Sequence, residues 1–343
     1  MKITKLHIQN FKSLINLELN DPNPFSVFVG PNGSGKSNIF EAIQLGILPK
    51  QFGTQNNNPA KTADLPNNII DLFGGLKAIK PKIGKPVSLI FDINFDNAPS
   101  FGYLKQFIKK NTIEIKVDLA YQNPPSQFEY RNHEDNPYIK NFSKLFVGNI
   151  GSRKINFFSE TKLNEDASNL ENVVKRLFEK SLIKDDIIDW LQLFIPGLKD
   201  IKVSFNSLTG NAEIAFYENS LKEALPKNLI SDGTYNTLSL LTAIYQTNEP
   251  QFLCIEEPEN GLHPFVIKQL VNFFRQQCKE KGHYIWLNTH SQTLVSELTP
   301  EEIITVTKEN GATKIKQHKG ENIYNLTMDE AWLSNALGGG VPW

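Results

Sequence analysis

Hydrophobic and polar residues alternate over the first part of the chain, in two runs separated by Lys12-Ser13. A period of two residues is typical of a β-strand with one buried face, so the pattern predicts two strands joined by a turn at Lys12-Ser13. A third apolar run, Phe25 to Val29, precedes a glycine-rich segment. The apolar positions of the first two runs are Ile3, Leu6, Ile8, Phe11, Leu14, Leu17 and Leu19.

The middle of the chain mixes strand and helix periods. A stretch rich in Asn, Pro and Gly from Pro49 to Asn68 interrupts a helical stripe and predicts a mobile surface loop. Alternation at Val87 to Phe95 and at Ile113 to Tyr121 predicts strands of a meander. Apolar residues three and four apart predict a helical region from Leu170 to about Phe194, and renewed alternation around Thr209-Gly210-Asn211 predicts a hairpin.

From Ser231 onward the predicted order is helix, apolar strand, helix, apolar strand, helix. This alternation is typical of a parallel sheet covered by helices. The chain has 343 residues, of which 40% are hydrophobic, so it can bury a large core in one elaborate domain or two modest ones.

Charge and composition narrow the class of protein. The formal net charge is -1, so no global field draws the chain onto nucleic acid or an anionic membrane. DNA binding would need a local basic patch, for which Lys77, Lys80, Lys82 and Lys85 are the candidates, although such a run is usually a solvated face. No leader peptide and no apolar run of about 20 residues is evident, and there are only two cysteines, so we expect a cytoplasmic protein without a membrane span.

The glycine-rich segment Gly30 to Ser37, called the phosphate loop below, reads Gly-Pro-Asn-Gly-Ser-Gly-Lys-Ser. It matches the pattern G-x-x-x-x-G-K-[ST] between a predicted strand and a predicted helix, which is the context that an ATP-binding loop requires. Glycines bring backbone N–H groups close to the phosphates, Lys36 reaches the β- and γ-phosphates, and the Ser37 hydroxyl binds Mg²⁺. The alternative is an ordinary glycine-rich turn. The predicted nucleotide-binding residues here are Asn32, Gly33, Ser34, Gly35, Lys36, Ser37 and the adjoining Asn38.

Two carboxylates end the apolar strand Phe252 to Ile255. Ligands of parallel sheets bind beyond the carboxyl ends of strands, which would place Glu256 and Glu257 at the same crevice as the phosphate loop. Glu256 is then the candidate Mg²⁺ partner and Glu257 the candidate base that orients the attacking water. The alternative is a solvated acidic turn.

The next predicted strand, Tyr284 to Asn288, is followed by Thr289-His290-Ser291. His290 at this strand end could contact the γ-phosphate or the attacking water. The alternative is a hydrogen-bonded or surface histidine without a role in chemistry.

Four segments together resemble the ABC-type AAA ATPases related to RecF, SMC and OLD proteins, in order and in spacing. This resemblance implies an α/β P-loop NTPase fold, the ABC-ATPase head, with a mixed central sheet, an antiparallel β lobe and a helical lobe. It also implies a homodimer, in which two heads join head to tail and sandwich two ATP molecules. The segments are Ile8 to Ser13, Gly30 to Asn38, Ser231 to Thr234 and Ile255 to Pro264.

The resemblance assigns further roles. Ser231 and Gly233 would bind the γ-phosphate held by the opposite head, although Ser231 read from the sequence alone is a helix N-cap. Glu257 would be the catalytic glutamate, His290 the switch histidine, and Lys12-Ser13 a turn that approaches the nucleotide. Glu256 stands where many relatives carry aspartate, so we expect its longer side chain to bind Mg²⁺ less tightly or at another angle.

Departures from relatives define a compact head. Ser231-Asp232-Gly233-Thr234 differs from the Ser-Gly-Gly-Gln of membrane transporters, and no sustained heptads predict coiled-coil arms. A short hairpin, Ile303 to Ile315, and a tail follow His290, so we expect no TOPRIM nuclease domain. We expect an ATPase core at 1–48 and 201–318, a variable lobe at 49–200, and a tail at 319–343.

The tail carries Trp332, three consecutive glycines and Trp343. It is either a docking peptide for a separately encoded effector or a segment packed on its own domain. The main functional hypothesis is an ATP-hydrolysing switch in prokaryotic DNA maintenance or antiviral defence. The alternatives are an ATP-stabilised scaffold that sequesters a toxic partner, and a dimer that binds DNA directly.

Overall fold

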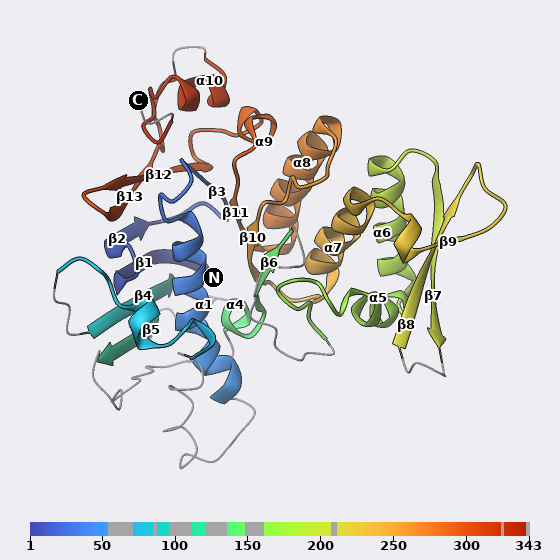
Figure 1. Ribbon diagram of the computed structural model, residues 1–343, viewed down its shortest axis with the longest axis horizontal. Coiled ribbons are helices and arrows are strands. Elements are labelled where there is room, and N and C mark those ends of the chain that lie inside the picture. Colours follow the sequence, from blue (N-terminus) through green and yellow to red (C-terminus); the bar gives the residue numbers. More distant parts are fainter. Residues whose placement is uncertain are drawn as a thin grey trace, which may run out of the picture. The chain divides into compact units, whose positions relative to one another are not determined.

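The computed structural model describes residues 1–53, 71–84, 88–96, 112–120, 136–147, 161–206, 211–323 and 326–340 (Figure 1). The chain divides into two compact units. Met1–Phe142 and Thr299–Trp343 form the first unit, and Ser143–Leu298 form the second. The expected variable lobe at 49–200 is thus divided between the two units at Phe142.

The first unit contains a four-stranded antiparallel sheet in the order β2-β1-β4-β5. Its strands are β1 (Lys2–Phe11), β2 (Leu14–Asn20), β4 (Ser88–Asp96) and β5 (Thr112–Ala120), which confirms the predicted strands and the turn at Lys12-Ser13. The buried positions of β1 are not spaced strictly by two residues. A register shift between Ile3 and Lys5 and a positive φ of 64° at Asn10 bring Ile3, Ile8 and Phe11 onto the buried face.

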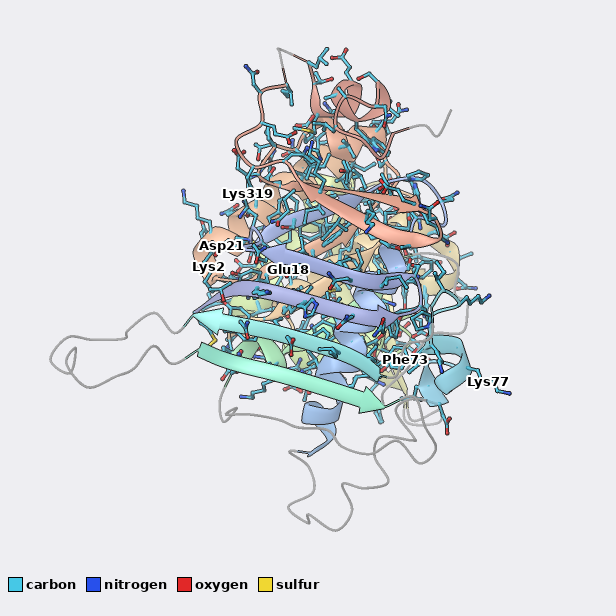
Figure 2. The ribbon with its side chains drawn as sticks, turned by 90° about the vertical axis from the view of Figure 1, so that its left-hand side faces the viewer. Lys2, Glu18, Asp21, Phe73, Lys77 and Lys319 are labelled. Atoms are coloured by element: carbon cyan, nitrogen blue, oxygen red, sulfur yellow. The ribbon has the colours of Figure 1, made fainter. Side chains whose placement is uncertain are left out.

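The other face of this sheet is polar (Figure 2). His7 on β1 lies between Asp92, 3.3 Å from its Nδ1, and Asn16, 2.9 Å from its Nε2. Where β1 begins and β2 ends, the Lys2 ammonium pairs with the Asp21 carboxylate at 3.1 Å, and Lys319 donates to the Asp21 carbonyl oxygen. The beginning of the chain and the segment after the last strand are therefore joined within this unit.

Three further strands of the first unit lie beside the phosphate loop. They are β3 (Phe25–Val29), β12 (Ile303–Glu309) and β13 (Ala312–Gln317), with β12 parallel to β3 and antiparallel to β13. Helix α1 (Lys36–Gly53) follows β3 and extends past Pro49, where a loop was expected. The rest of that expected loop, residues 54–68, lies outside the described residues. At Gly46 a Cβ would lie 2.3 Å from the Phe91 ring, so α1 packs closely on β4.

The second unit contains α5 (Leu170–Phe178) and α6 (Ser181–Phe194), two helices where one helical region was expected. They pack beside the antiparallel strands β7 (Leu198–Asn206), β8 (Asn211–Glu218) and β9 (Leu225–Pro226), and the pairing of β7 with β8 confirms the predicted hairpin. The apolar face of α5 is buried through Leu170, Val173, Val174 and Leu177.

The rest of the second unit follows the predicted alternation of helices and strands. It contains α7 (Asp232–Tyr245), β10 (Phe252–Glu256), α8 (Pro264–Lys281), β11 (Tyr284–Asn288) and α9 (Gln292–Ser296). Strands β10 and β11 are parallel and fully buried, and β6 (Phe142–Phe146) lies on the other side of β10. Both candidate catalytic segments thus leave the same end of adjacent parallel strands.

The tail of the chain forms α10 (Met328–Leu333) in the first unit. Trp332 is 6% exposed, and its indole N–H donates to the Gly339 carbonyl oxygen at 2.7 Å. Trp343 lies outside the described residues. Across the helices that the structure describes, none combines the length and apolar character needed to cross a bilayer.

His283, which precedes β11, is fully buried, and its Nδ1 accepts the Gln251 N–H at 3.3 Å. Burial, with the nearby charge of Lys281, lowers the pKa of His283 to about 4. Below about pH 6.5 the unfolded chain protonates this histidine, whereas the folded protein keeps it neutral down to about pH 4. Its contribution to folding stability is therefore fully present above about pH 6.5 and is lost as the pH falls toward 4.

We expect His283→Gln, which cannot titrate, to remove about 2 kcal/mol of the stability loss between pH 7.5 and pH 5.0. Urea denaturation of the parent and the variant at both pH values measures this difference. Equal losses in the two proteins would exclude His283 as the source.

Candidate nucleotide-binding and catalytic site

The phosphate loop connects β3 to α1 in the first unit. Gly33 and Gly35 have φ values of 75° and 108°, a region that residues with a Cβ rarely adopt. At Gly30 a Cβ would lie 2.0 Å from the Val306 carbonyl oxygen on β12. Glycine at these positions is therefore required by the backbone and by the neighbouring strand.

Carbonyl groups of the loop are bonded by donors within the unit. Lys36 Nζ donates to Gly30 O at 2.8 Å and to Pro31 O at 3.2 Å, and Thr313 Oγ1 donates to Ser34 O at 2.7 Å. Ser34 Oγ is buried and has no hydrogen-bond partner among the described residues. A buried hydroxyl donor, a lysine and a helix N-terminus in one loop fit a phosphate group.

The turn between β1 and β2 lies against the start of α1. Ser13 Oγ accepts the Asn38 side-chain N–H at 2.8 Å and lies 2.6 Å from Thr313 Oγ1. Lys12 instead pairs with Glu41, one turn into α1, and its ring neighbour is Phe11. Lys12 and Ser13 were both expected to approach the nucleotide. Ser13 is linked to the phosphate loop by its bonds to Asn38 and Thr313, whereas Lys12 pairs with Glu41.

Glu257 and His290 lie close together in the second unit. His290 Nε2 is 3.8 Å from Glu257 Oε1, and both side chains are partly exposed, at 38% and 25%. Glu257 has a φ of 52°, and its N–H donates to Asn288 O at 2.8 Å. A left-handed conformation at a glutamate costs about 1 to 3 kcal/mol and occurs where the surrounding structure fixes it, often at functional sites.

Glu256 has a different environment, because it is buried beside a lysine. Lys144 on β6 lies 2.8 Å from Glu256 Oε1 and 2.8 Å from Glu165 Oε1, and its side chain is 3% exposed. Asn288 also donates to Glu256 Oε2 at 3.4 Å. Burial opposes the charge on Lys144, but the two carboxylates outweigh it and raise the pKa of Lys144 above its usual value.

Glu259, which the sequence did not single out, joins the two strand ends. Its Oε1 accepts the His290 N–H at 3.1 Å and the Thr289 hydroxyl at 2.5 Å. The next residue, Asn260, donates to Val147 O, and its own carbonyl oxygen accepts the Asn236 amide at 2.9 Å. The turn after β10 is therefore bonded to β11, to the end of β6 and to α7.

Ser231 is the N-cap of α7, as its sequence context predicts. Its hydroxyl accepts the Thr234 N–H at 3.2 Å, and the residue is exposed. Gly233 packs against the turn after β10, because a Cβ there would lie 2.2 Å from Gly261 O.

The predicted site residues fall into two groups. Lys12, Ser13 and the loop through Asn38 belong to the first unit, and Ser231, Gly233, Glu256, Glu257 and His290 belong to the second. Among the described residues, no group of three or more His, Cys, Asp or Glu side chains is arranged so that it could hold a metal ion. Ser37 and Glu256, the expected Mg²⁺ partners, lie in different units.

Comparisons with known proteins identify similar chains. A family model described as "AAA domain, putative AbiEii toxin, Type IV TA system" matches residues 25–296. An "ATP/GTP phosphatase" of Helicobacter pylori is 19% identical, covering 86% of this chain and 87% of that protein. A "DNA replication and repair protein RecF" of Citrifermentans bemidjiense is 42% identical over 57 residues, which are 17% of this chain and 16% of that protein.

A solved structure is similar over nearly the whole length. The crystal structure of an SMC head bound to the C-winged helix domain of ScpA matches with a TM-score of 0.60 at 19% identity, covering 96% of this chain and 99% of that chain. At this identity the likeness concerns the fold, and it confirms the predicted α/β P-loop architecture.

The buried ion cluster of Lys144, Glu165 and Glu256 is expected to stabilise the fold. Lys144→Met leaves Glu165 and Glu256 buried without their cation, so we expect the free energy of unfolding to fall by about 3 to 5 kcal/mol. Lys184→Met is the control, because Lys184 is 33% exposed and lies 3.6 Å from Asp200, and it should cost at most about 1 kcal/mol. Urea denaturation measures both, and similar small losses would show that the Lys144 cluster contributes little.

Proposed function

Because the chain belongs to the AAA domain family whose model matches residues 25–296, and is an ABC-type ATPase resembling RecF and SMC heads, we propose that it is an ATP-driven molecular switch. In this proposal two copies close around two ATP molecules and reopen after hydrolysis. The observation that carries it is the phosphate loop, whose glycine backbone, buried Ser34 hydroxyl and Lys36 together fit a polyphosphate.

Each residue has a distinct role in the proposed mechanism. Lys36 exchanges its bonds to Gly30 O and Pro31 O for the β- and γ-phosphates, and Ser37 and Glu256 are the candidate Mg²⁺ partners. Bound Mg²⁺ would neutralise charge on the phosphates during transfer. The pairing of Glu256 with Lys144 favours contact with the ion through water, because part of the carboxylate charge is already compensated.

We propose that Glu257 and His290 act on the attacking water. In this proposal Glu257 orients the water or accepts its proton, and His290, whose Nε2 lies 3.8 Å from Glu257 Oε1, contacts the same water or the γ-phosphate. The bonds from Thr289 and from the His290 N–H to Glu259 hold the histidine segment beside the turn that carries Glu257. Proton transfer in such a site contributes about 10² to 10⁴-fold to the rate.

The opposite copy would complete the site through Ser231 and Gly233. An exposed serine hydroxyl at the start of a 14-residue helix, with a glycine in its first turn, offers donors and a partial positive charge to an anion. We propose that these groups bind the γ-phosphate of the ATP held by the other phosphate loop, so that closure depends on ATP rather than ADP.

The cellular role that we propose is in prokaryotic DNA maintenance or antiviral defence, in the cytoplasm, with a separately encoded effector that responds to closure. The name of the RecF relative supports the first setting, and the toxin–antitoxin wording of the family description supports a partnership with a second protein. The alternative from another class is an ATP-stabilised scaffold. Turnover that is slow and unchanged by DNA, with a stoichiometric partner that leaves only when ATP is removed, would favour the scaffold.

Glu257→Gln tests the catalytic assignment. We expect ATP to bind as in the parent, kcat to fall at least about 100-fold, and a dimer to accumulate in ATP, because the amide cannot accept the proton. Steady-state phosphate release and light scattering with ATP or ADP measure these effects. Hydrolysis at the parental rate would remove Glu257 from the mechanism.

Lys36→Ala tests the phosphate loop separately. Loss of the ammonium that reaches the phosphates should weaken ATP binding by at least about tenfold, since hydrogen bonds to charged groups contribute about 1.5 to 3 kcal/mol. Isothermal titration with ATP measures the affinity. Binding as tight as in the parent would contradict the assignment of Gly30 to Ser37 as the nucleotide site.

A further inference from the structure

Thr313 belongs to none of the sequence motifs, yet it contacts the phosphate loop. It lies on β13, is 1% exposed, and uses both its backbone and its side chain within the first unit. Its N–H donates to Ser13 O at 2.8 Å, and its Oγ1 donates to Ser34 O at 2.7 Å. A residue from the end of the fold is thus bonded to both predicted nucleotide-binding segments of the first unit.

The direction of these bonds follows from counting protons. Thr313 Oγ1 has one hydrogen, and the carbonyl oxygen of Ser34 can only accept, so that hydrogen is committed to Ser34. Ser13 must therefore donate to Thr313 across their 2.6 Å contact, and Asn38 donates to Ser13 at 2.8 Å. The result is one chain of bonds that runs from α1 through Ser13 and Thr313 and ends on the loop.

The last bond fixes a peptide unit of the loop. In a trans peptide the C=O and the following N–H point in opposite directions. Because the Ser34 carbonyl points at Thr313, the N–H of Gly35 is directed away from Thr313 and stays available for an anion. Backbone N–H groups of such loops are the donors that hold the α- and β-phosphates.

We propose that Thr313 is a positioning residue that orients the Ser34–Gly35 peptide for the phosphates of ATP and ADP. This inference rests on the proposed function, since it concerns the affinity of the same loop. Gly35 supports it: a Cβ there would lie 2.1 Å from Thr313 Oγ1 and 2.8 Å from Ser13 Oγ, so both hydroxyls lie directly against the loop backbone.

Hydrogen bonds to two other strands hold β13, which carries Thr313. Strand β13 pairs with β12, and the Gln317 side chain exchanges two hydrogen bonds with the Asn20 backbone, at 3.2 Å and 3.1 Å, at the end of β2. Thr313 is therefore held by two strands, while the glycines beside Ser34 leave the loop few restraints of its own. A side chain held in this way can restrict the loop before the nucleotide arrives.

Thr313→Val tests the inference, because valine matches the shape of threonine and removes only the hydroxyl. Loss of the bond leaves the Ser34 carbonyl unsatisfied and the peptide free to turn, so we expect the Kd for ATP and the Kd for ADP each to rise by about tenfold. Thr313→Ser keeps the hydroxyl and should bind within about twofold of the parent. Isothermal titration with each nucleotide measures these values, and the melting temperature without nucleotide reports folding.

Ser13→Ala is a second variant that breaks the chain of bonds one step earlier. We expect a smaller loss, about threefold, and no further loss when it is combined with Thr313→Val, because both act on the same peptide. Unchanged affinities in Thr313→Val and Ser13→Ala, with a parent that binds ATP, would overturn the inference alone. A parent that binds neither nucleotide would instead overturn the proposed function and this inference with it.

Discussion

A loop that binds phosphate through its backbone must have its carbonyl groups bonded elsewhere. Each peptide carries a donor and an acceptor, and the acceptors repel an anion unless they point away from it and find partners. Here Thr313 bonds the Ser34 carbonyl from outside the loop, whereas the Lys36 bonds to Gly30 O and Pro31 O are the ones that we propose it exchanges for the phosphates. Strands β12 and β13 and the β1–β2 turn each place atoms against the loop, and Thr313 on β13 supplies the donor to the Ser34 carbonyl.

In the second unit, a buried carboxylate likewise has bonded partners. Glu256 is buried at the end of β10, and Lys144 and Asn288 bond both of its oxygens, whereas Glu257, one residue later, turns through a left-handed conformation and stays partly exposed. The reversal at Glu257 separates two carboxylates that adjoin in sequence. One is held in a fixed buried network and the other faces His290, so the two acids of the motif are suited to different tasks.

The sequence predicted the features that depend on neighbouring residues. Strands β1, β2, β10 and β11, the turn at Lys12-Ser13 and the N-cap at Ser231 follow from periodicity and from local hydrogen bonding. Lys144, Glu259 and Thr313 were missed because their partners are distant: a lysine in a strand or a threonine in a hairpin gives no local sign of burial. The break between α5 and α6 and the extension of α1 past Pro49 were missed because helix ends depend on packing as well as on propensity.

The bond between Thr313 and Ser34 spans 279 residues of sequence, and this separation has a consequence for synthesis of the protein. At about 5 to 20 residues per second, a ribosome adds Ser34 roughly 14 to 56 s before it adds Thr313. During that interval the nascent chain contains the whole nucleotide-binding motif but lacks the strand against which the loop is fixed. If Thr313 orients the loop as proposed, full affinity for nucleotide arises only after β13 has been translated and has paired, and a growing chain does not close around ATP before its fold is assembled.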